Sequence, residues 1–479
     1  MKNSITQPLE ILNTLWEKAD ADFAKDLKSF FLYEERIREA ALLSAAKHIA
    51  LILESIDKTI VESEKRKEKY NIQRSDERNV LTTLGDVTFE RTYFLNKETG
   101  KYVYLLDKLL QLDSHERLSE QAEAEILKEA IDKSYSKGGK AIPEGSDISK
   151  VAVMNKVHNI IDFPDQKPKD KRKAKILFIE ADEDHIASQK GARERHPKGM
   201  IGKLVYIYED KEDICKGRRK LVQKFHIGGL YYGEENKNIW KEVWNYIDSN
   251  YDVDYLETIY VGSDCGNWIK AAGEELDKVV FAVDKYHLMS YINTAAHQML
   301  DEESIAKEKI WKYLAKGQKK NFQKIMSDMI ASANNIGPIE KCRDYILNNW
   351  KAVKVRMKLD KRYGCSAEGH VSHIYSDRLS SRPMGWVETG ADRMCMLRCF
   401  VENYGSEKII ELVRYTREKK RELKATGTEG ISIGQEEIKK VFETRHLSYG
   451  GYIDRLQVEI PGYYTIKKTL AIREQIGFI

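Results

Sequence analysis

The strongest constraint on the fold comes from a succession of short apolar runs and amphipathic segments between residues 174 and 284. The runs AKILFIEA, GKLVYIYED and KLVQKFHIGGLYY have the length and composition of strands, whereas NIWKEVWNYIDSN repeats its apolar residues at helical spacing. A fourth strand is indicated by YLETIYVGS, a helix by NWIKAAGEEL, and a short buried strand by KVVFAVD. This order of elements predicts an α/β core with a mixed five-stranded sheet.

Three antiparallel strands followed by alternating helices and strands match an RNase H-like catalytic core. We expect its first part at residues 174–290 and its completion at 364–479, which carries a glutamate-bearing helix and a C-terminal helical tail. The residues between them, 291–363, are basic and have helical spacing without a strand signal. They predict a helical insertion within the core.

Three smaller regions are expected before the core. Residues 1–75 repeat apolar positions at three- and four-residue steps, which predicts one or two long helices. At 76–112, β-branched and aromatic residues alternate with polar ones, which predicts a small antiparallel β meander. Residues 113–165 are expected to form a helix-turn-helix DNA-binding region, and the charged, Pro-broken stretch at 162–175 a linker.

The second helix of that region is expected in SDISKVAVMNKVHNII, after a Gly/Pro turn and with Ser or Asp as its N-cap. Its polar face would carry Lys150, Asn155, Lys156 and His158, which are the candidate DNA contacts. An ordinary helical hairpin would have the same spacing, so the pattern alone leaves both interpretations open.

Composition narrows the class of protein. Charged residues make up 33% of the chain and hydrophobic residues 42%, with only 8 prolines, as is typical of a helix-rich globular protein. No segment is apolar and long enough to span a bilayer, and the N-terminus lacks signal-peptide features, so we expect a cytoplasmic protein. Six cysteines without paired spacing favour a reduced compartment and no structural zinc site. A Walker loop and a GxGxxG motif are both absent.

The candidate chemistry lies in three acids that follow apolar runs far apart in the sequence: Asp182, Asp264 and Glu368. Two-metal phosphoryl transfer needs carboxylates from several segments, because the two cations lie about 4 Å apart and are ligated from several directions. Asp182 is expected at the end of the first, central strand, beside the end of the fourth strand, where Asp264 falls. Strand order would therefore make these two acids neighbours.

Each acid also has an ordinary explanation. Asp182 could belong to a solvated acidic turn and be confused with Glu183 or Asp184. Asp264 stands where a helix N-cap belongs, and capping alone would explain an aspartate there. For the third acid, Glu388 is an alternative to Glu368.

Other residues are possible accessories. Asp284 ends the last strand, and His287 follows it by three residues, although capping and a core or surface position would also explain them. Arg378, like Arg382, is expected to contact a phosphate backbone. Glu368 with the nearby histidines could bind a different metal, but the HExxH pattern of hydrolytic zinc sites is absent. Basic clusters such as KGRRK and KEKIWKYLAKGQKK are singly typical of solvated faces, and together they could follow a DNA duplex.

Several of these motifs look like family signatures. They are TLGDVTFERTYF, ISKVAVMNKVH, FIEADEDH, YVGSDCGNWIK with FAVDKYHL, and AEGHVSHIYSDRLSSRPMGW. Through them the chain resembles, over essentially its full length, the ISLre-type insertion-sequence transposases, which are related to Mutator-like DDE transposases and were long catalogued as an uncharacterised bacterial family. DKYHL is similar to the Cys/Asp-x-x-His motif of Mutator-like enzymes.

The resemblance implies a bacterial DDE transposase that hydrolyses a phosphodiester at a transposon end and joins the resulting 3′-OH to target DNA. It implies two Mg²⁺ ions, or Mn²⁺, with Asp182 bridging both and Asp264 and Glu368 each holding one. The implied partners are double-stranded DNA, both terminal inverted repeats and target, and further copies of the chain in a homo-oligomer on DNA, associated with the nucleoid and not with a membrane. A non-catalytic, domesticated DNA-binding regulator and a nuclease with the same core are the alternatives.

Overall fold

The computed structural model describes residues 3–142, 148–161, 168–189, 193, 195–196, 198–215, 218–360 and 363–425. The chain divides into two compact units, Met1–Lys156 with Ile410–Ile479, and Val157–Ile409. Residues 364–479 were expected to complete the core, but residues 410–425, the last that the structure describes, belong to the first unit. The tail predicted after residue 425 lies outside the described residues.

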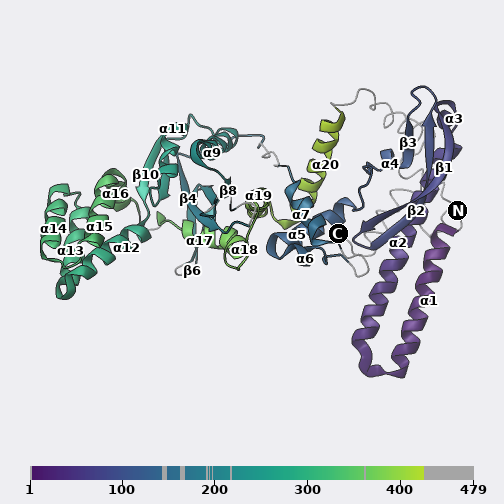
Figure 1. Cartoon of the computed structure of the whole chain (residues 1–479), viewed down its shortest axis with the longest axis horizontal. Helices are drawn as coiled ribbons and strands as arrows, with labels where there is room; N and C mark the ends of the chain where they lie inside the picture. Colours follow the sequence, from purple (N-terminus) through teal and green to yellow (C-terminus); the bar gives the residue numbers. More distant parts are fainter. Residues whose placement is uncertain are drawn as a thin grey trace. The chain divides into compact units, whose positions relative to one another are not determined.

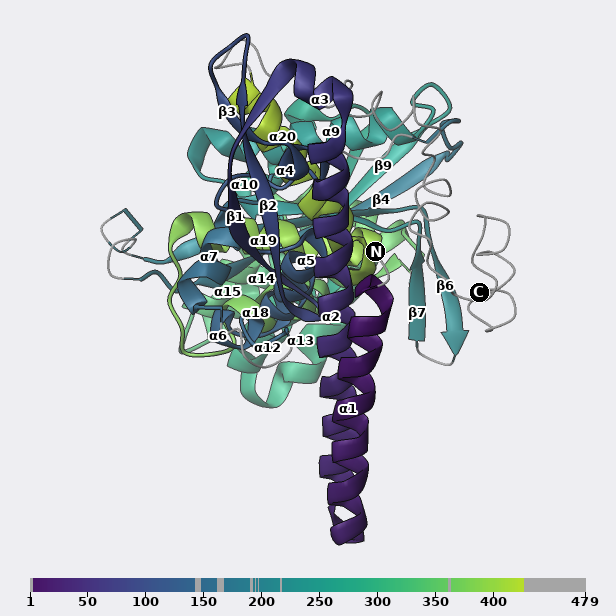
Figure 2. The same ribbon diagram turned by 90° about the vertical axis from the view of Figure 1, so that its right-hand side faces the viewer.

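The first unit begins with two long helices, α1 (Asn3–Lys25) and α2 (Phe30–Glu62), followed by the short α3 (Glu64–Lys69). The two long helices lie side by side in both Figure 1 and Figure 2. The Phe23 and Tyr33 rings stack across the turn at 4.6 Å. The prediction of one or two long helices is therefore met by two.

A three-stranded antiparallel sheet follows, in the order β1 (Tyr70–Thr82), β2 (Gly85–Asn96), β3 (Tyr102–Tyr104). The predicted meander started at residue 76, but β1 starts six residues earlier. The start of β1 is polar and exposed and lacks the alternation that marks a strand, and its strand conformation comes from pairing with β2 up to Tyr70↔Asn96. The short helix α4 (Leu105–Leu109) ends the meander region.

Three helices occupy the region of the predicted helix-turn-helix: α5 (Glu120–Asp132), α6 (Tyr135–Gly138) and α7 (Lys150–His158). Ser119 caps α5 by accepting a hydrogen bond from the Ala122 amide, and Ser149 accepts one from the Ala152 amide at the start of α7. The apolar side chains of α5 pack against Val153 of α7. The last described helix, α20 (Ile409–Ala425), is bonded to the start of α5 through Arg417.

The second unit contains the expected mixed five-stranded sheet. Its strands in chain order are β4 (Ile176–Ile186), β5 (Met200–Tyr208), β8 (Phe225–Leu230), β9 (Thr258–Ser263) and β10 (Val279–Val283). In space they run β10-β9-β4-β5-β8, with antiparallel pairs β4/β5 and β5/β8 and parallel pairs β4/β9 and β9/β10. The central strand is therefore the first in sequence.

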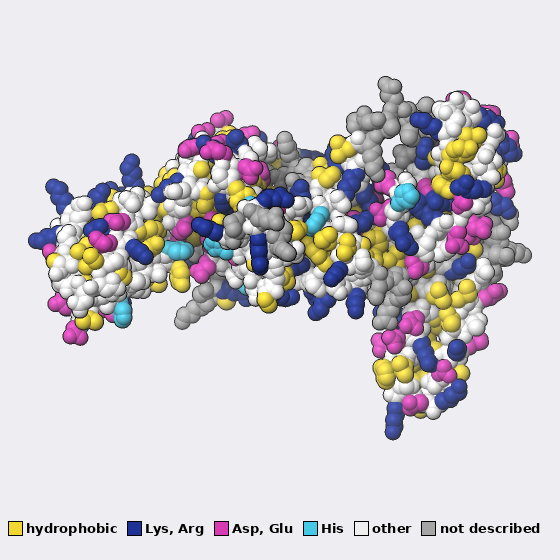
Figure 3. Space-filling model, in the orientation of Figure 1, with side chains coloured by type: hydrophobic (Ala, Val, Ile, Leu, Met, Phe, Trp, Pro, Cys, Tyr) yellow, Lys and Arg dark blue, Asp and Glu magenta, His cyan; other side chains and the backbone are white. Residues whose placement is uncertain are grey.

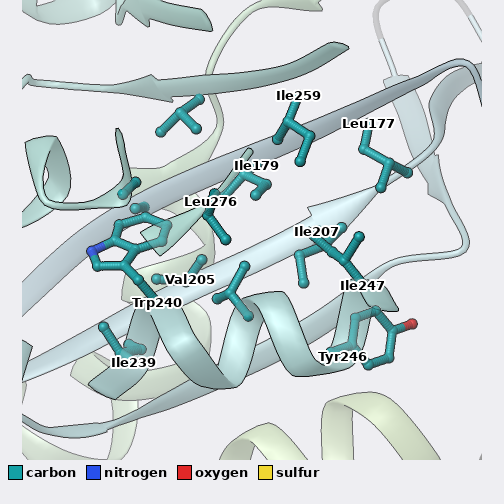
Figure 4. Packing of buried hydrophobic residues seen from close by; sticks show 14 of the residues in the cluster. Leu177, Ile179, Val205, Ile207, Ile239, Trp240, Tyr246, Ile247, Ile259 and Leu276 are labelled. Carbon is teal, nitrogen blue, oxygen red and sulfur yellow. The ribbon is translucent and has the colours of Figure 1, made fainter. Parts of the chain in front are cut away.

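One face of this sheet is covered by α9 (Asn236–Asn250). Its buried side chains recur every three or four residues and form a single apolar stripe, which includes Trp240 and Ile247. Figure 4 shows this stripe packed against Ile179 and Leu177 of β4 and Val205 and Ile207 of β5. The same strands direct their even-numbered residues to the opposite face, because side chains alternate along a strand.

The opposite face is covered by α17 (Ala367–Val371), a π-helical turn (Ser372–Ser376), α18 (Asp377–Leu379) and α19 (Glu388–Tyr404). Tyr375 from the π-helical turn approaches so closely that a Cβ on Gly228 of β8 would lie 1.9 Å from its hydroxyl. Glycine at position 228 therefore permits this helical layer to touch the sheet.

Two segments differ from the prediction. The run KLVQKFHIGGLYY was expected to be one strand, but it divides into β7 (Arg218–Val222) and β8, with Gln223 at φ +52° between them. β7 pairs instead with β6 (Asp210–Cys215) in a separate two-stranded hairpin, visible in Figure 2. The helix expected at NWIKAAGEEL is two short helices, α10 (Asn267–Lys270) and α11 (Ala272–Glu275).

The insertion was predicted at 291–363, but its first helix begins at Lys285. Five α-helices and a 3₁₀ helix (His297–Glu302) are described between β10 and α17, and no strand occurs among the described residues of that segment. The five α-helices are α12 (Lys285–Ala296), α13 (Glu303–Ala315), α14 (Lys319–Ser332), α15 (Gly337–Asn348) and α16 (Trp350–Lys358). They enclose their own apolar core, which includes Phe322, Met326 and Ile346.

Candidate active site

Asp182 lies in β4, and Asp264 directly follows the neighbouring parallel strand β9 in a matching position. The pairing of β4 with β9 reaches Glu180↔Gly262, and each aspartate lies two residues further along its own strand direction. Asp182 was expected at the end of its strand, but it lies within β4, because β4 continues to pair with β5 as far as Ile186. Burial, together with the negative charge of Asp264, raises the pKa of Asp182 to about 6.

Asp264 does not cap a helix. The N-cap of α10 is Gly266, and the Asp264 carboxylate accepts a hydrogen bond from the Gly266 amide at 2.9 Å in a tight turn. Cys265 between them has φ +65°. This turn leaves Asp264 exposed just after β9.

The third predicted acid, Glu368, lies in α17 and borders the same cavity as the two aspartates. This cavity has a volume of about 160 Å³. Its lining residues come from β4, β9, the start of α12 and the start of α17; they are Ala181, Asp182, Ser263, Asp264, Asp284, Tyr286, His287, Cys365, Ser366, Ala367, Glu368 and Gly369. The structure thus brings Asp182, Asp264 and Glu368 to one cavity, although 104 residues separate the last two.

The three carboxylates are not arranged as ligands of one common ion. Across the residues that the structure describes, no three His, Cys, Asp or Glu side chains are arranged to hold a metal ion jointly. The three acids therefore share a cavity, and their joint ligation of two cations stays a prediction. All three donors are carboxylates, the ligand type that Mg²⁺ and Mn²⁺ prefer. A cation would also relieve the repulsion that raises the pKa of Asp182.

Asp284 and His287 both line the cavity and form a pair. Asp284 is buried and caps α12, accepting hydrogen bonds from the amides of Tyr286 and His287 at 3.2 Å. Its carboxylate also lies 2.9 Å from Nδ1 of His287. The hydrogen bond to Asp284, with the charges of Asp264 and Asp182, raises the pKa of His287. The capping explanation for Asp284 is therefore correct, and the cap places the His287 imidazole beside the acids.

Two other candidates lie away from the cavity. Arg378 is 3% exposed, and its guanidinium lies 4.7 Å from the centre of the Trp386 ring. The structure thus buries Arg378 against Trp386, where the sequence interpretation expected a contact with a phosphate backbone. Glu388 does not line the cavity, and its carboxylate lies 3.4 Å from both Arg195 and His196.

The four candidate DNA contacts on α7 divide into two kinds. Lys150 and Asn155 are exposed, as predicted. Lys156 instead forms ion pairs with Glu116 at 2.8 Å and Glu123 at 2.9 Å, and His158 is half-buried, which lowers its pKa. The polar spacing of α7 did not distinguish a solvated lysine from one that neutralises acids on the preceding segment.

A buried acid that the sequence interpretation missed is Glu180 in β4, which is 3% exposed. It accepts hydrogen bonds from the hydroxyls of Tyr206 and Tyr208, from the Lys211 ammonium and from the Ser366 amide. Burial opposes its ionisation, but Lys211 and these donors outweigh burial and lower its pKa. Strand alternation was the available signal, because it places residues 180 and 182 on the same face.

Two histidines, the buried His226 of β8 and the partly buried His370 of α17, connect these two elements. Nε2 of His226 lies 3.2 Å from Nδ1 of His370, and Nδ1 of His226 lies 3.2 Å from the Asn403 side-chain oxygen. That oxygen only accepts hydrogen bonds, so Nδ1 of His226 donates and its Nε2 accepts from His370. Burial, with contributions from Lys224 and His370, lowers the pKa of His226 to about 3.

This arrangement makes the second unit sensitive to acid. Histidine in the unfolded chain titrates near pH 6.5, so the unfolded state binds the extra proton between that pH and the lower folded pKa. Stability from neutral His226 is therefore complete above pH 6.5 and is lost as the pH falls, by roughly 2 kcal/mol at pH 5. Urea unfolding at pH 7 and pH 5 should show this loss in the native protein and a smaller one in His226→Gln. The exposed His297→Gln is the control, and an equal loss in His226→Gln would contradict the assignment.

Positive charge near this site is dispersed. On the face in Figure 3, Lys and Arg side chains alternate with acidic and apolar ones and do not gather into one stripe. A second, shallower cavity of about 470 Å³ is lined in part by His185, Arg193 and the exposed Arg382.

No helix in the described part of the chain has the length and apolar character needed to cross a membrane.

Comparison with known proteins identifies the family. A family model described as an uncharacterised protein family, UPF0236, matches residues 25–416. Two UPF0236 proteins of Caldanaerobacter subterraneus subsp. tengcongensis are 34% identical over 416 residues (86% of this chain, 85% of the relative) and 36% identical over 381 residues (78% and 79%). A Drosophila P element transposase strand transfer complex aligns over 77% of this chain and 94% of its own at 12% identity, with a TM-score of 0.20, which is too low to support an argument. The chain belongs to the uncharacterised protein family UPF0236.

Proposed function

We propose that this chain is a DNA transposase of the DDE type, which cleaves DNA at transposon ends and joins the 3′-OH to target DNA. The observation that carries the proposal is that Asp182, Asp264 and Glu368, from three distant segments, line one cavity. The sheet supports it, because the strand order 3-2-1-4-5 in chain order, with the first three strands antiparallel, is the order expected of an RNase H-like core.

The names of the relatives give independent support. The name of one relative combines eleven numbered designations from a single organism, and the name of another combines four. A gene present in many copies in one genome is expected of a mobile element and is unusual for a single-copy regulator. The family description itself assigns no activity.

Asp182, Asp264 and Glu368 are the residues that would hold two Mg²⁺ or Mn²⁺ ions. When bound, such ions supply Lewis-acid stabilisation of the attacking and leaving oxygens during in-line displacement. Among the chain's own groups, the imidazole of His287, oriented by Asp284, lines the cavity beside the three acids and is available to hydrogen-bond a phosphate oxygen. Arg193 and Arg382 on the second cavity, and Lys150 and Asn155 on α7, are the groups available for the DNA backbone.

The partners in this proposal are double-stranded DNA and further copies of the same chain. Cleavage and joining at two ends of one element require two active sites, which favours a homo-oligomer assembled on DNA. A regulator that binds DNA without chemistry and a nuclease that cleaves without joining remain the competing functions, and both are separable by experiment.

The test compares two glutamates that sequence alone did not separate. The full chain is incubated with Mg²⁺ and a supercoiled plasmid carrying the DNA that flanks its gene. We expect cleavage to 3′-OH ends followed by joining, a loss of about 100-fold in Glu368→Gln, and a change within about threefold in Glu388→Gln, since only Glu368 borders the cavity.

Each other outcome selects another function or residue. Cleavage without joining would identify a nuclease. DNA binding without cleavage by the native chain would identify a regulator. A large loss in Glu388→Gln with none in Glu368→Gln would transfer the third role to Glu388. Gel analysis of end-labelled products distinguishes all four results.

A further inference from the structure

We propose that Glu180 is a positioning residue that sets the place of Glu368 relative to Asp182, by fastening the start of α17 to the central strand. This inference rests on the proposed function, because it concerns the same three acids. Asp182 and Glu180 are on one face of β4, whereas Glu368 comes from a helix that is separated from β4 by the whole helical insertion. Something must therefore fix the helix on the strand.

The fastening is a direct bond between the strand and the residue before α17. The carboxylate of Glu180 accepts a hydrogen bond from the Ser366 amide at 2.5 Å and another from the Ser366 hydroxyl at 3.1 Å. Ser366 is the N-cap residue of α17, and Glu368 follows it by two positions. The bond thus spans 186 residues of sequence and ends beside the third acid.

Glu180 is itself held from three other directions. Its oxygens accept from the Tyr206 hydroxyl, from the Tyr208 hydroxyl at 2.6 Å and from the Lys211 ammonium at 3.0 Å. Lys211 is 8% exposed and also donates to the Gly364 carbonyl at 2.5 Å. The lysine therefore joins the same two segments a second time, two residues before Ser366.

A further contact holds α17 beyond Glu368. The His370 ring stacks on Tyr206 at 4.2 Å, and its Nδ1 lies 3.2 Å from Nε2 of His226 on β8. Residues 366 and 370 are four apart and share a helix face, so both attachments are made on the side toward the sheet. Glu368 lies between them, exposed and on the cavity.

Stability alone does not explain a buried ion pair at this point. Replacing such a pair by apolar residues is often neutral or favourable, because both charges must be desolvated. An apolar side chain at position 180 would fill the space but could not accept the Ser366 amide. Only a hydrogen-bond acceptor at position 180 can fix the position of the Ser366 amide. In metal sites, loss of such a contact around the ligands typically lowers metal affinity or activity by about 10–100-fold.

Two double variants isolate this property. Glu180→Gln/Lys211→Met keeps an acceptor for Ser366 and leaves no unpaired charge, whereas Glu180→Leu/Lys211→Met lacks the acceptor and also leaves no unpaired charge. In the full chain, Mn²⁺ affinity is measured by electron paramagnetic resonance, amide exchange of residues 366–371 by mass spectrometry, and cleavage by the plasmid assay. The exposed Glu212→Gln is the control for substitution near Lys211.

We expect the glutamine variant to stay within about threefold of the native chain in Mn²⁺ affinity and cleavage. The leucine variant should lose about 10–100-fold in both and exchange faster at 366–371. Equal Mn²⁺ affinity and equal exchange in the two variants would overturn the positioning role. If the native chain neither binds Mn²⁺ nor cleaves, the proposed function fails, and the exchange of 366–371 still decides whether Glu180 fastens α17.

Discussion

Asp182→Asn is expected to lower Mg²⁺-dependent DNA cleavage by about 10³-fold or more and to raise the melting temperature of the metal-free protein. Lewis-acid stabilisation by metal contributes several kcal/mol to phosphoryl transfer, and each 1.36 kcal/mol is a tenfold change in rate. Asp182 is the acid in the middle of the group, since it is on the central strand and interacts with both Asp264 and His287. Loss of this ligand should therefore cost more than loss of Glu368.

The expected rise in the melting temperature of Asp182→Asn follows from the burial of Asp182 and its repulsion by Asp264. Burial and Asp264 both disfavour the ionised form of Asp182, so a neutral asparagine removes an unfavourable charge. Asp184→Asn is the matched control for cleavage, because it changes the same residue type on the same strand face. Burial raises the pKa of Asp184 as well, so this variant is not a control for stability. Asp184 accepts a hydrogen bond from the Ser380 hydroxyl at 2.9 Å, which an asparagine oxygen would keep. Thermal unfolding and plasmid cleavage of both variants decide the prediction, and cleavage by Asp182→Asn at the native rate would remove Asp182 from the site.

Glu123→Leu is expected to destabilise the first unit by about 3–5 kcal/mol, because it leaves a buried cation without its partner. Glu123 is 4% exposed and Arg417 is 5% exposed. The Arg417 guanidinium donates to the Glu123 carboxylate, and the Lys156 ammonium donates to the same oxygen at 2.9 Å. One substitution therefore removes an acceptor that two cations share, while Lys156 keeps Glu116 and Arg417 keeps the Leu118 carbonyl.

Hydrogen exchange separates the two units in this experiment. Amides of α5 and α20 should lose protection in Glu123→Leu, whereas those of β4 and β9 in the second unit should keep it. Glu125→Leu is the control, since Glu125 is on the same helix but forms a surface pair with Lys128, worth at most about 1 kcal/mol. Equal loss of protection in the two variants, or loss in β4, would contradict the assignment.

The sequence was most informative where periodicity and burial agree. Continuous apolar runs predicted β4 and β10, and the spacing of Trp240 and Ile247 predicted α9, because these elements bury their apolar residues against one another. Strand order also predicted that Asp182 and Asp264 would be neighbours, whereas Glu368 rested mainly on the family resemblance. The early start of β1 and the division at Gln223 were missed, because polar exposed residues take strand conformation there through pairing and turn geometry.

Side-chain roles were predicted less well than strands. Lys156 and Arg378 were assigned to DNA on residue type, but tertiary neighbours decide whether a cation meets solvent, a carboxylate or a tryptophan ring. Glu180 was overlooked for the same reason. Its partners Lys211 and Ser366 are 31 and 186 residues away, and no local pattern reports such distances.

The bond between Glu123 and Arg417 also has a consequence for synthesis on the ribosome. The two residues are 294 positions apart, so α5 emerges roughly 15–60 s before its arginine at ordinary elongation rates. Lys156 emerges only 33 residues after Glu123 and is available as an earlier partner. The second unit ends at Ile409, so its residues emerge from the ribosomal tunnel before those of α20. The unit that begins the chain is therefore expected to be the last to reach its final structure.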